Sequence, residues 1–166
     1  MTRIPSQPDV QPELKPGEAL TRKGIDELPY AGNITPTETW QRLEDDPTAL
    51  LIDVRTTEEW AYVGVPDVDE LGHHVHYVPW LFFPRMNVNP EFVQHVIRSV
   101  EPETDTPMYF LCRSGIRSAY AAHAMTEAGY TQCFNVTGGF EGDMDDDHRR
   151  GSVNGWKVAG LPWEQN

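Results

Sequence analysis

The sequence predicts an α/β fold in which a mainly parallel sheet is flanked by helices. Two observations lead to this prediction. Short apolar runs of strand length alternate with stretches of helical periodicity from about residue 34 to residue 136. The run at residues 49–54 is compact and mostly apolar, which is typical of a parallel strand buried on both faces. The length of 166 residues is within the usual range for one domain.

The first 32 residues differ from the rest of the chain. They are polar, contain five prolines and show neither helical nor strand periodicity. We therefore predict an extended N-terminal arm over residues 1–32, either packed onto the domain or mobile, followed by a domain over residues 33–166. A short helix opens this domain, because Thr35 can cap it, Pro36 suits its first position and Glu38 can complete a capping box.

The remaining elements follow in alternation. Strands are predicted at residues 49–54, 74–78, 108–111 and 132–136, and helices at residues 90–100 and 118–128. Thr56 or Thr57 is expected to cap a turn after the first strand, and Gly129 to end the last helix. In open α/β sheets the functional site lies at the carboxyl ends of the strands, so we expect it there.

The charge of the chain limits its partners. There are 13 Lys and Arg residues against 26 Asp and Glu residues, so the net charge is −13 at pH 7. A polyanion would be repelled over most of this surface, which argues against nucleic acid and an anionic membrane as partners. No apolar run approaches the roughly 20 residues of a membrane span, and the first residues lack the apolar region of a signal peptide. Two cysteines cannot build a disulfide framework, so we expect a soluble cytoplasmic protein.

The sharpest candidate for chemistry is the segment Cys112–Ser118, which reads Cys-Arg-Ser-Gly-Ile-Arg-Ser between a predicted strand and a predicted helix. A tight loop at this place turns backbone N–H groups inward and adds the positive end of the helix dipole, and both favour an anion at the sulfur. Arg113 and Arg117 add two permanent charges, and Gly115 permits backbone angles that a β-carbon forbids. We therefore predict that Cys112 is a nucleophile.

This loop resembles the active-site loop of the rhodanese family, in which Cys-x-x-x-x-Arg follows a central strand. Three other segments resemble family motifs in the same order along the chain: the first strand motif, the late strand with its Gly-Gly turn, and the terminal segment. They are Asp53-Val54-Arg55 with Glu58-Glu59-Trp60, Asn135–Phe140 and Gly155–Trp163. The stretch Val63–His74 departs from the family pattern. The resemblance covers most of residues 34–163 and implies a three-layer rhodanese-like fold.

The resemblance implies a sulfurtransferase without a metal or a cofactor. Cys112 would take sulfane sulfur from a small anionic donor such as thiosulfate and pass it to a thiol, to cyanide or to a protein sulfur carrier. The substrate-binding residues that the resemblance implies are Arg113, Ser114, Gly115, Ile116, Arg117 and Ser118, with Asp53 and Arg55 in support. Arg113 and Arg117 are candidates for binding sulfonate oxygens. Two roles stay open for Arg117, which can bind the donor or pair with Asp53, while Arg55 supports the pocket or pairs with a nearby acid.

Two other functions fit the same pattern. Phosphatases and arsenate reductases of a related fold use Cys-x-x-x-x-x-Arg, which is one residue longer and cradles a larger tetrahedral phosphate. Here four residues separate Cys112 from Arg117, and this smaller ring favours sulfur. The second alternative is a non-catalytic interaction module of the same fold, although such a module does not need a thiolate followed by two arginines.

For the aromatic, histidine and acidic segments outside the Cys112 loop, the sequence predicts structural roles. The aromatic stretch Trp80–Pro84 is predicted to pack in the core, and the alternative is that it lines the mouth of the pocket or contacts a partner. Cys133 is predicted to lie inside a strand as a small buried hydrophobe, with a role as a resolving thiol as the alternative. The histidines of residues 73–76 lack further ligands at the spacing of a metal site. The acidic segment Asp143–His148 lacks the glycine and glutamate of an EF-hand loop, which predicts a solvated turn in an insertion before the terminal segment.

Overall fold

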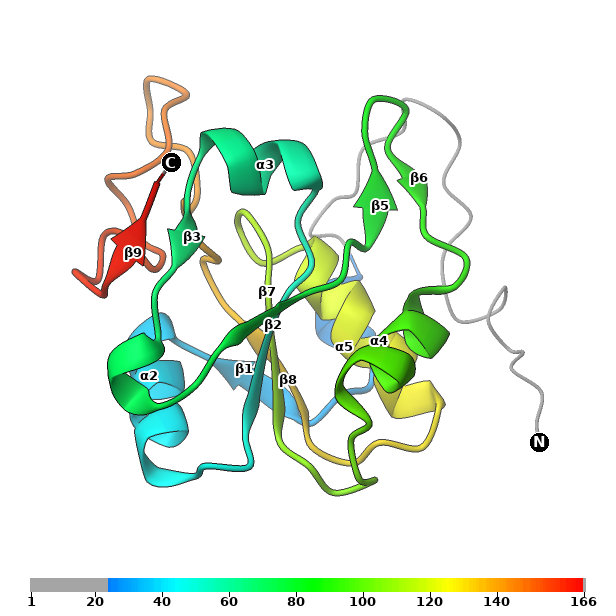
Figure 1. Cartoon of the computed structure of the whole chain (residues 1–166). Coiled ribbons are helices and arrows are strands. Elements are labelled where there is room, and N and C mark those ends of the chain that lie inside the picture. The colour runs from blue at the N-terminus through cyan, green and yellow to red at the C-terminus, as the bar shows by residue number, and fades with distance from the viewer. Residues whose placement is uncertain (1–23, 166) are drawn as a thin grey trace.

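A five-stranded sheet lies at the centre of the molecule in the computed structural model, which describes residues 24–165 (Figure 1). The strand order is β1-β8-β7-β2-β4, and every neighbouring pair is parallel. The strands are β1 (Gly32–Ile34), β8 (Cys133–Val136), β7 (Met108–Leu111), β2 (Leu50–Asp53) and β4 (Val75–Tyr77). The prediction of an α/β fold with a mainly parallel sheet is confirmed.

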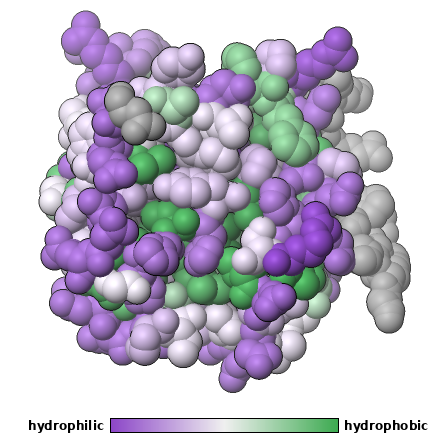
Figure 2. Space-filling view, viewed as in Figure 1, coloured by the Kyte–Doolittle hydropathy of each residue, from purple (hydrophilic) through white to green (hydrophobic). Residues whose placement is uncertain are grey.

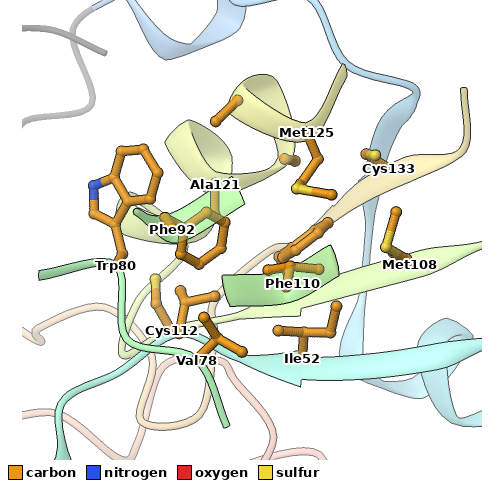
Figure 3. Close-up of a cluster of buried hydrophobic side chains, with 14 of the residues drawn as sticks. Ile52, Val78, Trp80, Phe92, Met108, Phe110, Cys112, Ala121, Met125 and Cys133 are labelled. Atoms are coloured by element: carbon orange, nitrogen blue, oxygen red, sulfur yellow. The ribbon is translucent and has the colours of Figure 1, made fainter. Parts of the chain in front are cut away.

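Helices flank the sheet, because its central strands are apolar on both faces. They are α2 (Pro36–Asp45), α4 (Phe92–Val100) and α5 (Arg117–Glu127), while α3 (Thr57–Tyr62) lies beyond the carboxyl end of the sheet (Figure 1). On one face, Ile52 and Phe110 pack against α4 and α5 in the cluster that Figure 3 shows. On the other face, Leu51 and Leu111 pack with Leu43 of α2. Adjacent residues of a strand thus enter opposite cores, which is why these strands lack polar alternation.

Local signals in the sequence set the start of the first helices. The Thr35 hydroxyl precedes α2 and accepts a hydrogen bond from the Glu38 backbone N–H at 3.1 Å. Thr56 caps α3 in a complete capping box, since its side chain accepts from the Glu59 N–H while the Glu59 carboxylate accepts from the Thr56 N–H. The two later predicted helices correspond to α4 and α5 within two residues at each end.

The described residues before the first strand pack against the domain. A 3-10 helix at Ile25–Glu27 buries its first side chain, and the Ala31 N–H donates to the Cys133 carbonyl at 2.9 Å. Residues 24–32, which the sequence assigns to an extended arm, therefore belong to the packed structure. The rest of the predicted arm, residues 1–23, lies outside the described residues.

Two small sheets lie apart from the central one. In the first, β3 (Val65–Pro66) pairs with β9 (Trp163–Glu164), and in the second, β5 (Leu81–Phe82) pairs with β6 (Asn87–Val88). The second sheet corrects the prediction for the aromatic stretch. Trp80 and Leu81 are buried, but Phe82 and Phe83 are 46% and 56% exposed on the β5–β6 hairpin, where Figure 2 shows apolar surface. Core packing holds only for the first half, because the hairpin carries the second half away from the sheet.

In the described part of the chain, no helix is long and apolar enough to cross a membrane. Within residues 24–165, no three His, Cys, Asp or Glu side chains are gathered as a metal site would require. His73 is buried instead, and its Nε2 lies 2.5 Å from the Leu43 carbonyl oxygen at the end of α2. This histidine therefore joins two segments of the fold.

Candidate active site

Cys112 lies directly after β7, the middle strand of the sheet, at the carboxyl edge. Its side chain is 1% exposed and borders the apolar cluster between the sheet and helices α4 and α5 (Figure 3). The chain then turns at Gly115, whose φ of 104° is a backbone angle that favours glycine. The turn directs the Gly115 N–H at Cys112 Sγ, at 3.1 Å. A backbone amide of the loop thus donates to the sulfur in largely apolar surroundings.

The Gly-Gly turn after β8 clamps the other side of this loop. Gly139 approaches so closely that a β-carbon there would collide with the Cys112 carbonyl oxygen. Because residue 139 has no side chain, the next two amides reach the loop. The Phe140 N–H donates to the Cys112 carbonyl at 2.8 Å, and the Glu141 N–H donates to the Arg113 carbonyl at 3.0 Å. These bonds fix both carbonyl groups toward the turn.

Ser118 and Asn135 complete the surroundings of the sulfur. Ser118 lies in the first turn of α5, and its Oγ is 3.2 Å from Cys112 Sγ and 2.5 Å from Asn135 Oδ1. Asn135 also donates from Nδ2 to the Gly115 carbonyl at 3.1 Å. A site role for Asn135 is not visible in the sequence, because the pairing of β8 with β7 is what brings this asparagine to the loop.

A cleft of about 580 Å³ opens beside the sulfur. The predicted loop residues that line it are Cys112, Arg113, Ser114, Ile116 and Arg117. Its charged residues outside the loop are Glu58, Glu59, Glu141 and Arg150, and the β5–β6 hairpin adds Leu81 and Phe83. The cleft therefore combines charged groups for an anion with an apolar wall.

Arg117 forms a bidentate ion pair with Glu59 of α3. Its Nη1 and Nη2 donate to Glu59 Oε1 and Oε2 at 2.7 and 2.8 Å, and the two side chains are 10% and 18% exposed. This finding corrects one of the two roles left open for Arg117, since its partner is Glu59 and not Asp53. Burial by itself raises the pKa of Glu59, but the hydrogen bonds and charge of Arg117 outweigh burial and lower that pKa to about 2.

The two arginines of the loop, Arg113 and Arg117, differ in how accessible they are to a ligand in the cleft. Burial alone lowers the pKa of Arg117, but the hydrogen bonds to Glu59 and the attraction of the Cys112 sulfur raise it overall. Arg117 is thus a fixed charge beside the sulfur. Arg113 is exposed at the cleft. An exposed cation and a fixed one therefore share the site.

Asp53 and Arg55 form a second buried pair. Arg55 Nη2 donates to Asp53 Oδ2 at 2.7 Å, and both side chains are fully buried. The same guanidinium donates to the Gly64 carbonyl and lies 4.4 Å from the centre of the Phe140 ring. The acid left open for Arg55 is therefore Asp53. Since the Phe140 N–H holds the Cys112 carbonyl, Arg55 braces the turn that clamps the loop.

The acidic segment forms a turn at the surface. The Asp145 carboxylate accepts hydrogen bonds from the backbone N–H groups of Asp147 and Arg149, both at 2.9 Å. Beyond this turn, Arg150 lines the cleft and donates to the Gly142 carbonyl at 2.7 Å. The insertion therefore contributes a residue to the wall of the site as well as a turn.

The second cysteine lies far from the first along the sheet. Cys133 pairs with Met108 at the start of β7, whereas Cys112 follows the end of that strand. It is fully buried, and burial raises the pKa of its thiol to about 12. Cys133 is the small buried hydrophobe that the sequence predicts.

The chain is similar in sequence to several known proteins. A family described as the STR4 middle domain matches residues 31–166. The uncharacterized protein RP600 of Rickettsia prowazekii is 36% identical over 132 residues, which cover 80% of this chain and 96% of the relative. A sulfurtransferase of Allochromatium vinosum is 32% identical over 122 residues, which cover 74% of this chain and 84% of the relative.

The chain is also similar to proteins of known structure. The crystal structure of Rv0390 from M. tuberculosis has a TM-score of 0.77 at 46% identity and covers 83% of this chain and 100% of that chain. The solution structure of the rhodanese-like domain of the Anabaena protein Alr3790 has a TM-score of 0.53 at 18% identity, with 81% and 79% coverage, and shows the fold alone. The family match, the sulfurtransferase relative and the shared fold show that this chain belongs to the rhodanese-like sulfurtransferase family, as the four sequence motifs indicate.

Proposed function

We propose that the protein is an enzyme like thiosulfate sulfurtransferase, which moves sulfane sulfur from a small anionic donor to a thiol or cyanide through a persulfide on Cys112. The observation that carries this proposal is the setting of the sulfur. The Cys112 sulfur lies at the end of the central strand, where it accepts a hydrogen bond from the Gly115 N–H. It borders a cleft that Arg113 and Arg117 also line. A fixed N–H group and two cations favour an anionic sulfur at this place.

The proposed reaction consists of two displacements at sulfur. In the first, the Cys112 thiolate attacks the outer sulfur of thiosulfate, a new S–S bond forms, the bond between the two donor sulfurs breaks, and sulfite leaves with the electron pair. The negative charge then lies on the terminal sulfur of the persulfide. In the second, cyanide or a thiolate attacks that terminal sulfur, the persulfide bond breaks and the Cys112 thiolate is restored. Atoms and charge balance in both displacements.

The two arginines take different parts in this proposal. Thiosulfate is a dianion, so the exposed Arg113 is the side chain that binds its sulfonate oxygens. Arg117 stays against Glu59 and supplies a fixed positive charge near the reacting sulfurs. Groups that are already in place stabilise a developing charge without reorganisation.

Intact-mass spectrometry after exposure to thiosulfate tests this proposal. We expect one added sulfur, about 32 Da, because nucleophilic attack leaves a single atom on the enzyme. Peptide mapping should place it on Cys112 and not on the buried Cys133, and cyanide should remove it. A protein that gains no sulfur from thiosulfate, from mercaptopyruvate or from a persulfide would contradict the proposal.

Arg113→Ala is expected to weaken donor binding more than chemistry. We expect the KM for thiosulfate to rise about tenfold with little change in kcat, because an interaction made equally with bound donor and transition state changes KM alone. Arg98→Ala is the matched control, since Arg98 is an exposed arginine of α4 outside the residues that line the cleft. Steady-state kinetics with thiosulfate and cyanide measure both constants. An unchanged KM would show that Arg113 does not bind the donor.

A further inference from the structure

The hydroxyl group of Ser118 has two polar neighbours and one proton. Its Oγ lies 3.2 Å from Cys112 Sγ and 2.5 Å from Asn135 Oδ1. A serine hydroxyl donates a single hydrogen bond, so the proton can serve one of these two atoms at a time. The orientation of the Asn135 amide decides which one.

The neighbours of Asn135 fix that orientation. Its Nδ2 lies 3.1 Å from the Gly115 carbonyl oxygen, which can only accept, and 3.0 Å from Asn33 Oδ1. The Tyr30 O–H donates to the same Asn33 oxygen at 2.7 Å, so this oxygen is an acceptor in both contacts. If the Asn135 amide were flipped, its Oδ1 would face the carbonyl oxygen of Gly115, and neither oxygen could donate a hydrogen bond. Asn135 Oδ1 therefore faces Ser118, and it accepts the serine proton.

The Ser118 oxygen consequently presents a lone pair to Cys112. A neutral thiol can donate its S–H into that lone pair, whereas a thiolate faces an electron-rich oxygen. We propose that Asn135 is a positioning residue, which holds the Ser118 proton away from the sulfur and thereby controls how readily Cys112 ionises. This inference rests on the proposed function, in which the thiolate is the reacting species.

Stabilisation of the thiolate by Ser118 would require an exchange of hydrogen bonds. The hydroxyl would have to turn its proton from Asn135 Oδ1 to Cys112 Sγ, which leaves a buried carbonyl oxygen without this donor. The Gly115 N–H needs no such exchange, because it already points at the sulfur. Gly115 and the fixed Arg117 therefore favour the anion, while the pair of Ser118 and Asn135 favours the neutral thiol.

Charged groups from several neighbouring elements also face the cleft beside the sulfur. Those that line the cleft with Cys112 are Glu58 and Glu59 from α3, Arg113 from the loop, Arg117 from α5, and Glu141 and Arg150 from the segment after the Gly-Gly turn. Asp53 and Arg55 at the end of β2 neutralise each other in their own pair. A substitution of one neutral side chain by another leaves these charges in place, so a difference between such variants reports the hydrogen bonds at Cys112.

The test is the pH dependence of Cys112 alkylation by iodoacetamide in a Cys133→Ala background, because the reagent reacts with the thiolate. Ser118→Ala removes the lone pair, and we expect the midpoint of the profile to fall by about one pH unit, or about tenfold in rate on the acid side. A hydroxyl that donates to the thiolate predicts the opposite shift. A midpoint that rises or stays unchanged would overturn the inference.

The role of Asn135 itself is tested in both Ser118 backgrounds. Asn135→Ala frees the serine proton for the sulfur, so the midpoint should fall when Ser118 is present and stay unchanged when residue 118 is alanine. A purely structural role predicts the same shift in both backgrounds and would overturn the assignment. Asn135→Ser replaces Asn135→Ala in the same comparison if circular dichroism shows that the alanine variant does not fold.

Sulfur loading of the wild-type protein is measured separately, by mass. A protein with the expected alkylation midpoints that gains no sulfur contradicts the proposed function and supports the role of Asn135. A protein that gains sulfur on Cys112 but shows a raised midpoint in Ser118→Ala supports the proposed function and overturns the role of Asn135.

Discussion

Cys112→Ser is expected to reduce thiosulfate-dependent transfer to cyanide to the background rate, a loss of more than about a thousandfold. A serine oxygen is far less nucleophilic than a thiolate and cannot form a persulfide, so the first displacement has no acceptor for the sulfur. The substitution exchanges one buried atom for a smaller one, and the fold should survive. Thiocyanate formation measures the transfer, with circular dichroism on the same samples. Undiminished turnover would defeat the assignment of Cys112.

Cys133→Ser is the matched control for this variant. It makes the same chemical change in the same sheet, but at the start of β8, where Cys133 is fully buried and burial raises its pKa to about 12. The folded variant should therefore keep wild-type turnover. A hydroxyl in the core lowers stability, so turnover is compared per folded molecule. An equal loss in both variants would show that the loss comes from damage to the fold and not from the nucleophile.

The arrangement of strands and helices could be predicted because the local pattern and the packing agree. Leu51 and Ile52 are neighbours in β2 that enter opposite cores, and this two-sided burial is what an uninterrupted apolar run indicates. Thr35 begins α2 through its own side chain, a signal contained within four residues. The β5–β6 hairpin could not be predicted in this way, because an aromatic run gives no sign of where it leaves the core.

Prediction of the site was limited by contacts between distant parts of the chain. Cys112 and its loop are contiguous, so their chemistry is visible in seven residues. Glu59 lies 58 positions from Arg117, and the sequence shows it only as one acid in the turn after the first strand. Of the two roles left open for Arg117, the pair with Asp53 does not form, because Arg55, two residues from Asp53, already occupies its carboxylate.

Glu59→Gln is expected to lower the free energy of unfolding by about 3 kcal/mol at neutral pH, at the lower end of the range for breaking a buried ion pair. Glu59 serves two elements at once, since Oε1 accepts the Thr56 N–H at the start of α3 while both oxygens accept from Arg117. Glutamine has no charge, and its amide NH2 group replaces one of the two acceptor oxygens, so the second hydrogen bond from Arg117 and the ionic attraction are both lost. Urea unfolding measures the difference. Glu58→Gln is the control, because Glu58 is the exposed neighbour on the same helix.

The same pair makes stability depend on pH in a defined window. The pKa of Glu59 is about 2 in the folded protein against an ordinary 4.5, so the folded state binds fewer protons than the unfolded state. The stabilisation is complete above about pH 4.5 and is lost as the pH falls toward about 2. Wild-type protein should therefore lose stability more steeply than Glu59→Gln across this window, and equal slopes would show that Arg117 does not hold the carboxylate. Glu59 also holds the Arg117 guanidinium beside Cys112. Protonation of the Glu59 carboxylate therefore affects both the stability of the fold and the electrostatics of the site.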